Sequence, residues 1–180
     1  MDNIKEEKKM YRKEVKLAKE EHSFFQKKEL SKPVWEKLEK EDYFINSNIV
    51  LAYWSMSDEV RTHEFILRWY KKKTILLPCV EGDILKLRVF EGMETMRKGE
   101  AYSILEPIGK EFADTDKIDL MIIPGIAFDK EYNRLGRGKG YYDKLLSSAC
   151  SIKVGVCFEF QFFDKIPTEE FDIKMNYILR

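Results

Sequence analysis

The clearest chemistry in the sequence lies in the segment Arg134–Tyr142, where glycines alternate with cations. Three glycines in five residues weaken regular structure, so they need a reason. One reason is the close approach of backbone N–H groups to an anion, which a Cβ atom would hinder. Arg134, Arg137 and Lys139 add three full positive charges. We therefore predict that the whole segment binds phosphate groups: Arg134, Leu135, Gly136, Arg137, Gly138, Lys139, Gly140, Tyr141 and Tyr142.

A strand and a helix must position this loop. Residues 118–123 are almost wholly apolar, as expected of a strand that is covered on both faces. A short helix is expected near residues 141–148, and its start would add free N–H donors and partial positive charge. Ligands of open α/β sheets bind beyond the carboxyl ends of the strands, where this loop must lie. The alternative is a mobile surface loop with incidental charge.

The loop matches neither common nucleotide-binding motif. A Walker loop requires Ser or Thr directly after its Lys, whereas Gly140 follows Lys139. A dinucleotide fingerprint requires GxGxxG and an acidic residue about 20 positions later, and this segment reads GxGxG.

Two carboxylates flank the loop. Asp143 falls in the first turn of the expected helix, where it is either a carboxylate favoured by the helix dipole or a ligand of Mg²⁺ beside phosphates. Asp129 ends the turn PGIAFD, and we predict that its carboxylate accepts hydrogen bonds from nearby backbone N–H groups.

Composition limits the class of protein. The 180 residues suit a single domain, 1–180, with 44% hydrophobic and 36% charged residues. Lys+Arg and Asp+Glu are both 32, which gives no reason to expect nucleic-acid binding. No apolar run is long enough to span a membrane, and the charged N-terminus is unlike a signal peptide. Three cysteines without CxxC spacing predict buried free thiols and a cytoplasmic location. The two histidines, His22 and His63, are expected to have structural or surface roles.

The remaining pattern predicts an α/β fold. Residues 3–29 are predicted to form one long helix on which Lys8, Arg12 and Lys16 share a side. The simpler explanation of these cations is a helix face exposed to solvent. Ser31 is expected to cap a second helix that begins near Pro33. Alternating strands and helices indicate a mostly parallel sheet. The other expected elements are strands at 48–54, 74–80, 84–90, 152–158 and 173–179, a helix at 62–72, and a loop with short elements at 91–117.

The motifs together resemble one enzyme family. PGIAFD followed by NRLGRGKGYYDKLL is similar to the signature of 5-formyltetrahydrofolate cyclo-ligases, also called methenyltetrahydrofolate synthetases. Similar family segments occur in the expected order along most of the chain. They are KKMYR at Lys8–Arg12, WSMSDEVRT at Trp54–Thr62, LEP at Leu105–Pro107, FEFQ at Phe158–Gln161 and FDIKMN at Phe171–Asn176.

The resemblance implies a three-layer α/β/α sandwich and an ATP- and Mg²⁺-dependent ring closure. 5-Formyltetrahydrofolate would become 5,10-methenyltetrahydrofolate, with release of ADP and phosphate. The formyl oxygen would attack the γ-phosphate, and nitrogen 10 would then close on the activated carbon.

The resemblance also implies residue roles. ATP would be held by Lys8, Lys9, Arg12 and the loop Arg134–Tyr142, with Arg134, Arg137 and Lys139 as catalytic cations. Mg²⁺ would be bound by Asp143 and Asp172. The folate would contact Trp54, Glu59 and the loop residues Arg137, Gly138, Lys139, Gly140 and Tyr141. The implied partner is a small-molecule substrate, with neither nucleic acid nor membrane. The oligomeric state is open, and a monomer is the expected form.

Two positions depart from the family pattern. Cys79 stands where the family usually has Arg, and Asn176 stands where a second carboxylate often follows the C-terminal metal-binding Asp. Two other classes of protein remain as alternatives. One is a sugar-phosphate isomerase or acyl transferase, which would not need ATP. The other is a non-catalytic RNA-binding module that stacks bases on aromatics near the basic helix and the loop.

Overall fold

A six-stranded sheet forms the centre of the molecule. The computed structural model describes residues 2–99, 104–147 and 149–180. The strand order is β11-β9-β6-β1-β2-β3, and the neighbours pair in parallel except for the antiparallel pair β2 and β3. These strands are β1 (Ile49–Leu51), β2 (Thr74–Glu81), β3 (Ile84–Val89), β6 (Leu120–Pro124), β9 (Ile152–Val156) and β11 (Tyr177–Leu179). The expected mostly parallel α/β sheet is confirmed.

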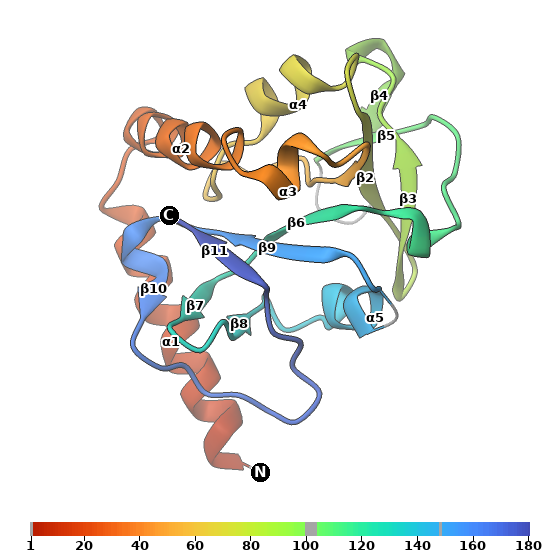
Figure 1. Ribbon diagram of the computed structural model, residues 1–180. Helices are drawn as coiled ribbons and strands as arrows, with labels where there is room; N and C mark the ends of the chain where they lie inside the picture. Colours follow the sequence, from red (N-terminus) through yellow and green to blue (C-terminus); the bar gives the residue numbers. More distant parts are fainter. Residues whose placement is uncertain (1, 100–103, 148) are drawn as a thin grey trace.

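Helices cover both faces of this sheet (Figure 1). The helices α2 (Phe24–Leu38), α3 (Asp42–Ile45) and α4 (His63–Trp69) lie on one face, and α5 (Tyr141–Ser147) lies on the other. Strand β6 shows why both faces must be covered. Leu120 and Ile122 pack into the core under the first group of helices, and Met121 and Ile123 pack into the core that contains Leu146 of α5. The apolar run at 118–123 therefore supplies both cores of an α/β/α sandwich.

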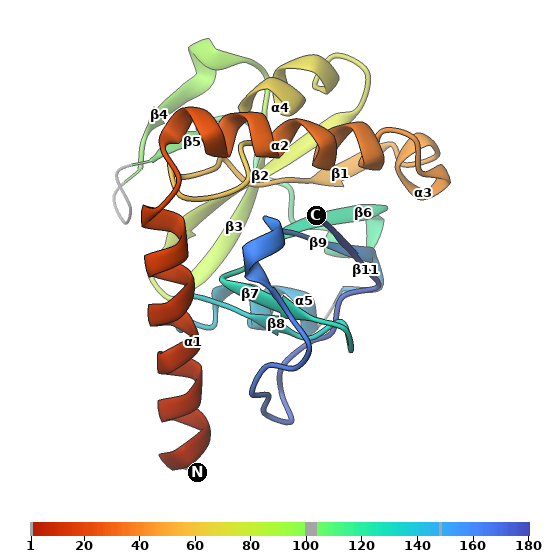
Figure 2. The ribbon, with the colours of Figure 1, turned by 90° about the vertical axis from the view of Figure 1, so that its left-hand side faces the viewer.

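Helix α1 (Asp2–Glu20) stands along one side of the molecule (Figure 2). It packs on a small three-stranded sheet of order β10-β7-β8, made of β10 (Phe162–Phe163), β7 (Ala127–Asp129) and β8 (Arg134–Leu135). Val15 of α1 joins Ala127 and Leu135 of this small sheet in a third buried cluster. The packing brings the N-terminal helix next to the loop that follows β8.

The expectation of one helix over residues 3–29 was wrong, because the chain breaks between α1 and α2. Ser23 caps α2 by accepting a hydrogen bond from the backbone N–H of Gln26 at 3.2 Å, and Gln26 accepts one from the backbone N–H of Ser23 at 2.8 Å. This reciprocal pair is a capping box, and the spacing Ser-x-x-Gln was its sequence signal.

Ser31 does not cap a helix, which corrects a second expectation. It is buried inside α2, where its hydroxyl donates to the carbonyl of Lys27 at 2.7 Å and accepts from the N–H of Arg61 at 2.9 Å. Pro33 lies within the same helix. Ser31 therefore joins α2 to the segment before α4.

The expected irregular region 91–117 contains only short elements among its described residues. These are the 3₁₀ turns η1 (Met93–Thr95) and η2 (Thr115–Lys117), and the hairpin strands β4 (Met96–Lys98) and β5 (Leu105–Pro107). Residues 100–103 of this region, and Ser148 at the end of the expected helix, lie outside the described residues. A third 3₁₀ turn, η3 (Glu159–Gln161), follows β9. Within the described ranges, none of the helices is long and apolar enough to cross a bilayer.

The cysteines divide between core and surface. Cys79 and Cys157 are buried, as expected, but Cys150 is exposed. Burial raises the pKa of the Cys79 thiol to about 11 and that of Cys157 to about 12. Cys79 packs its sulfur 3.5 Å from the carbonyl oxygen of Pro107.

Candidate active site

The glycine-rich loop connects β8 to α5 at the carboxyl ends of the parallel strands, as expected. Gly138 and Gly140 have φ values of +98° and +69°, a region in which residues with a Cβ are strained. Gly136 has a different reason, because a Cβ there would lie 2.9 Å from Nη1 of Arg134. The backbone path of the loop therefore depends on these glycines.

Asp129 holds the turn that precedes the loop. Its carboxylate is fully buried and accepts hydrogen bonds from the backbone N–H groups of Glu131, Asn133 and Ile166, and from the side chain of Asn133. The expectation of a turn residue that binds backbone N–H groups is confirmed. Four such bonds on one carboxylate fix the start of β8 and so the origin of the loop.

Helix α1 contributes cations beside the loop. Nε of Arg12 donates to the carbonyl oxygen of Gly136 at 3.0 Å. Lys8 is only 7% exposed, whereas Lys16 is exposed and pairs with Glu20 at 3.8 Å. The explanation as a solvated helix face was therefore wrong for Lys8 and Arg12, and it holds for Lys16. Lys9 lies on the exposed side of α1 and pairs with Glu6 at 3.9 Å.

Lys8 binds the segment that precedes β11. Its ammonium lies 2.6 Å from Oδ2 of Asp172 and 2.8 Å from Oε2 of Glu169. Burial lowers the pKa of Lys8, but the hydrogen bonds to the two carboxylates outweigh burial, so the pKa is raised. Asp172 is thereby brought to the cationic face of α1.

Asn176, which replaces a frequent family carboxylate, takes part in strand pairing. Its side-chain oxygen accepts from the N–H of Lys153 at 2.8 Å, and its own N–H donates to the carbonyl of Lys153. The side-chain oxygen of Asn176 therefore joins the residue before β11 to β9.

Arg134 and Asp143 form a close pair beside the loop. Nη2 of Arg134 donates to Oδ1 of Asp143 at 2.6 Å, and the arginine side chain is 4% exposed against 27% for the aspartate. Within the described part of the chain, Nε of Arg134 is buried without a hydrogen-bond partner. The pair therefore gives Asp143, which lines the pocket described below, a buried counter-ion.

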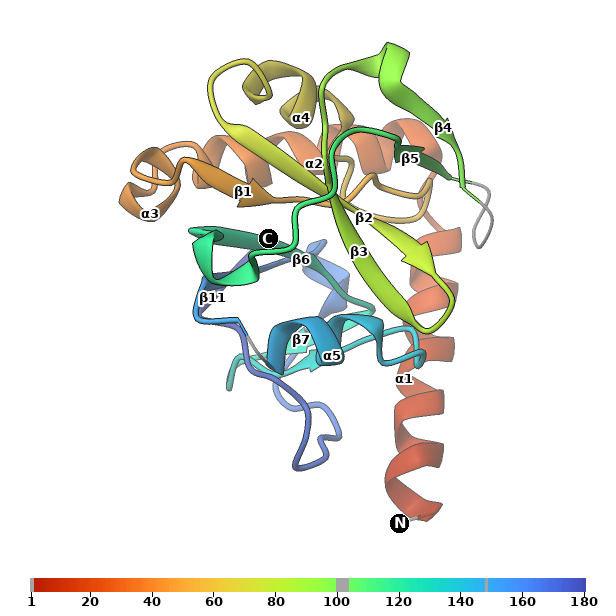
Figure 3. The same ribbon diagram turned by 90° about the vertical axis from the view of Figure 1, so that its right-hand side faces the viewer.

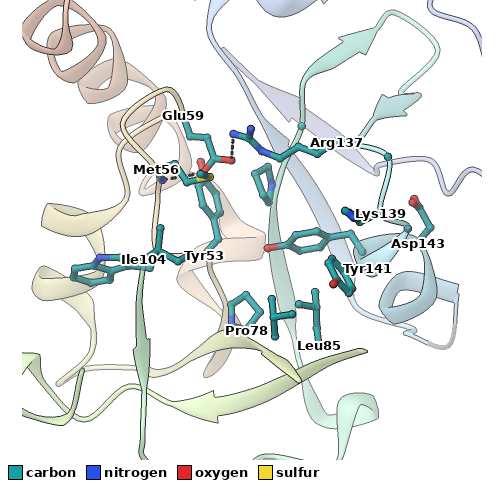
Figure 4. A pocket seen from close by; sticks show the side chains of 18 of the residues that line it. Tyr53, Met56, Glu59, Pro78, Leu85, Ile104, Arg137, Lys139, Tyr141 and Asp143 are labelled. Carbon is teal, nitrogen blue, oxygen red and sulfur yellow. Dashed lines mark hydrogen bonds and ion pairs between the residues drawn. The ribbon is translucent and has the colours of Figure 1, made fainter. Parts of the chain in front are cut away.

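The expected substrate segment after β1 faces the loop. Glu59 accepts from Nη2 of Arg137 at 3.0 Å and from the N–H of Met56 at 3.0 Å (Figure 4). Trp54 is 9% exposed and stacks on His63 with ring centroids 4.0 Å apart. The ion pair between Arg137 and Glu59 connects the two walls of the site.

A pocket of about 900 Å³, counting the part open to solvent, lies between these walls. The loop and the segment after β1 supply most of its polar lining. Strands β2 and β3 supply apolar lining, and the β4–β5 hairpin supplies Ile104 and the charged Glu106 (Figure 4). The lining includes Tyr53, Trp54, Met56, Glu59, Pro78, Val80, Leu85, Ile104, Glu106, Pro124, Gly125, Arg134, Gly136, Arg137, Gly138, Lys139, Gly140, Tyr141, Tyr142 and Asp143.

The tip of the β2–β3 hairpin lies beside α5 (Figure 3). The hydroxyl of Tyr141 donates to the carbonyl of Gly82 at 3.2 Å, and Nζ of Lys144 donates to the carbonyl of Asp83 at 3.1 Å. Lys139 is exposed, and among the described residues it makes no ion pair. Lys139 is thus a cation in the lining of the pocket that pairs with none of the described carboxylates.

The carboxylates suit a hard metal ion that arrives with phosphate. Over residues 2–99, 104–147 and 149–180, no group of three His, Cys, Asp or Glu side chains could hold a metal by itself. Mg²⁺ commonly takes only one or two carboxylates and completes its shell with water and substrate phosphates. Asp143 lines the pocket and fits this pattern, whereas Asp172 is held by Lys8 and is not among the lining residues.

The sequence interpretation missed two residues behind the loop. Lys19 of α1 is 4% exposed and pairs with Asp58 at 3.0 Å, and Asp58 also binds Arg137. The signal was available, because Lys19 lies one turn after Val15 on the side of α1 that packs on the protein. Glu106 of β5 was also missed as a lining residue.

Comparisons with known proteins agree on one family. A sequence profile described as the 5-formyltetrahydrofolate cyclo-ligase family matches residues 4–180. A 5-formyltetrahydrofolate cyclo-ligase of Mus musculus is 31% identical over 150 residues, which cover 74% of this chain and 73% of the relative. A probable 5-formyltetrahydrofolate cyclo-ligase of Schizosaccharomyces pombe is 33% identical over 150 residues, covering 72% and 73%.

The fold leads to the same group of proteins. The NMR structure of Aquifex aeolicus 5,10-methenyltetrahydrofolate synthetase superposes with a TM-score of 0.86 at 33% sequence identity, covering 96% of this chain and 88% of that one. The family profile spans nearly the whole chain, including the loop, the segment after β1 and the N-terminal helix. The chain therefore belongs to the 5-formyltetrahydrofolate cyclo-ligase family of enzymes.

Proposed function

We propose that this enzyme converts 5-formyltetrahydrofolate to 5,10-methenyltetrahydrofolate, consumes ATP with Mg²⁺, and releases ADP and phosphate. The observation that carries the proposal is the single pocket in which the cationic glycine loop faces the segment Tyr53–Glu59. One wall carries charges that suit phosphates, and the opposite wall carries aromatic rings and a carboxylate that suit a pterin.

The loop would bind the triphosphate. Its glycines carry no Cβ that would hinder an anion from approaching the backbone N–H groups, and Lys139 adds a cation that pairs with none of the described carboxylates. Arg12 bonds to the loop at Gly136 and would add charge from α1, with Lys8 one turn before it on the same side of the helix, whereas Lys9 is exposed and pairs with Glu6. Phosphoryl transfer depends mainly on such positioning and charge neutralisation.

Asp143 would hold the Mg²⁺ that accompanies ATP. Asp172 is bound to Lys8 and does not line the pocket, so it would become a second carboxylate only after releasing Lys8. When bound, the metal would neutralise charge on the transferred phosphate. Arg134 would orient Asp143, since its guanidinium is buried against that carboxylate. We therefore assign Arg134 a positioning role at the metal site.

The folate would lie against the opposite wall. Glu59 would accept hydrogen bonds from the pterin N–H groups, because each carboxylate oxygen can accept more than the one bond that it has here. Trp54 already packs on His63 and Phe90, so we assign stacking on the pterin to Tyr141 and lateral contact to Trp54.

The test is a direct assay with purified protein, 5-formyltetrahydrofolate, ATP and Mg²⁺. Absorbance of the methenyl product is followed under mildly acidic conditions, and ADP is measured in parallel. Product and ADP should appear in equal amounts, and only when ATP and Mg²⁺ are both present. No product from protein shown to be folded would refute the proposal. Turnover of a sugar phosphate or acyl donor without ADP would favour the alternative enzyme class.

A further inference from the structure

Lys19 is a buried charge that no role assigned above explains. Its side chain is 5% exposed, and its ammonium lies 3.0 Å from Oδ2 of Asp58. Lysine is almost never fully buried unless it is paired. The burial of Lys19 against Asp58, next to the pocket, therefore calls for a reason beyond anchoring α1.

The pair begins a row of alternating charges that ends in the pocket. Nη2 of Arg137 lies 2.9 Å from Oδ1 of Asp58 and 3.0 Å from Oε1 of Glu59. The row therefore runs Lys19, Asp58, Arg137, Glu59 and joins α1, the segment after β1 and the glycine loop. Figure 4 shows its last contact, between Arg137 and Glu59.

Arg137 is shared by two carboxylates that compete for it. Burial would raise the pKa of Asp58, but the charges of Lys19 and Arg137 outweigh burial, so the pKa is lowered and Asp58 stays ionised. Lys19 supplies Asp58 with a second cation. Without Lys19, Arg137 would be the only counter-ion in this row that is left to the half-buried Asp58. Arg137 would therefore be drawn towards Asp58 and away from Glu59.

Helix α1 also holds the loop at the neighbouring residue. Arg12 lies two turns before Lys19 and donates to the carbonyl oxygen of Gly136. One side of α1 thus contacts the loop directly at Gly136, and indirectly at Arg137 through Asp58. The position of Arg137 across the mouth of the pocket depends on both contacts.

We propose that Lys19 is a positioning residue: by neutralising Asp58 it leaves Arg137 bound to Glu59, and so holds the glycine loop across the pocket. The kinetic consequence rests on the proposed function, while the position of Arg137 does not. Misplacement of a loop by about 1 Å can cost about 100-fold in rate, so the effect should be measurable.

The test compares Lys19→Met with Lys16→Met. Both variants remove one lysine from α1, but Lys16 is exposed and pairs with Glu20 on its own helix. Urea unfolding checks that both variants are folded. In Lys19→Met, kcat/KM for ATP should fall by at least about tenfold, and in Lys16→Met it should fall by less than about twofold. Equal values in the two variants would overturn the proposal.

A second variant separates positioning from simple anchoring of α1. Lys19→Met combined with Asp58→Asn removes the competing carboxylate as well, so Arg137 should return to Glu59 and most of the lost kcat/KM should be recovered. A merely anchoring lysine predicts no recovery, because the double variant has even fewer contacts between α1 and Asp58.

Crystal structures of the same variants test the proposal without any assay. In Lys19→Met, the distance from Arg137 Nη2 to Glu59 should exceed about 4 Å, the usual limit of an ion pair. It should stay near 3 Å in Lys16→Met and in the double variant. If the wild type lacks cyclo-ligase activity but these distances behave as described, the proposed function fails and the role of Lys19 stands. An unchanged distance in Lys19→Met would refute the role of Lys19.

Discussion

Asp143 on the rim of the pocket is oriented by Arg134 buried behind it, with 2.6 Å between Oδ1 and Nη2. The arginine is 4% exposed and the aspartate 27% exposed, so the cation is fixed inside the protein while the carboxylate reaches the pocket. The carboxylate is thus the counter-ion of a buried guanidinium, so the pair contributes to stability whether or not Asp143 binds a ligand.

We predict that Asp143→Asn weakens the response to Mg²⁺. The amide keeps the shape and one hydrogen bond to Arg134 but loses the charge, so the Mg²⁺ concentration for half-maximal turnover should rise by about tenfold or more. Stability should fall by about 1–3 kcal/mol, because a buried guanidinium loses its counter-ion. Turnover is measured against Mg²⁺ at fixed ATP, and unfolding is measured in urea.

The control for this variant is Asp116→Asn, which neutralises an exposed carboxylate on η2, at the opposite ends of the parallel strands. It should change neither quantity. If Asp143→Asn needs no more Mg²⁺ than Asp116→Asn does, Asp143 is not a metal ligand, and its role is confined to pairing with Arg134.

Lys139 offers a cleaner separation of function from stability. It is exposed, and none of the described carboxylates pairs with it, so Lys139→Ala should change the free energy of unfolding by less than about 0.5 kcal/mol. In the proposed mechanism Lys139 binds the transferred phosphate, so its loss should lower turnover by about 100- to 1,000-fold. Lys117→Ala on η2 removes an exposed lysine far from the loop in the chain and should leave turnover unchanged. Near-normal turnover in Lys139→Ala would remove the loop's main catalytic cation from the proposal.

We predict that replacing Lys8 lowers the free energy of unfolding more than replacing an exposed lysine of the same helix does. Lys8→Met leaves Asp172 and Glu169 without their shared cation, and breaking such a partly buried pair should cost about 2–3 kcal/mol. Lys13→Met removes an exposed lysine from the same helix and should cost almost nothing. Urea unfolding of both variants at neutral pH measures the difference. Coincident unfolding curves would mean that the Lys8 contacts are too weakly formed to order the segment around Asp172.

The sequence allowed the sheet, the loop and its place at the strand ends to be predicted, because each has a local signal. Each signal depends only on residues that are close together in the sequence. The signals are the apolar run at 118–123, the alternating glycines and the turn at Asp129. The capping box at Ser23 was equally local and was overlooked in favour of a continuous helix.

The ion pairs of the site could not be predicted in the same way. Lys8 and Asp172 are 164 residues apart, and Arg137 and Glu59 are 78 apart. Charge periodicity on α1 is the same for Lys8, Arg12 and Lys16, yet only tertiary packing decides which of them is buried. A single sequence records that these residues are charged but not which carboxylate each of them meets.

His63 gives the protein a specific sensitivity to acid. It stacks on Trp54, and burial lowers its pKa from 6.5 to about 4, with the charge of Arg61 adding to the effect. The folded state therefore favours the neutral ring. Its contribution to stability is complete above pH 6.5 and is lost as the pH falls from 6.5 towards 4.

We predict that His63→Phe, which keeps an aromatic ring against Trp54 but cannot be protonated, lacks this loss. The free energies of unfolding of the wild type and the variant are measured in urea at pH 7.5, 5.5 and 4.5. Subtracting one from the other at each pH cancels the carboxylate effects that both proteins share. As the pH falls, the variant should become steadily more stable relative to the wild type. A difference that does not depend on pH would show that His63 is protonated as readily in the folded protein as in the unfolded chain.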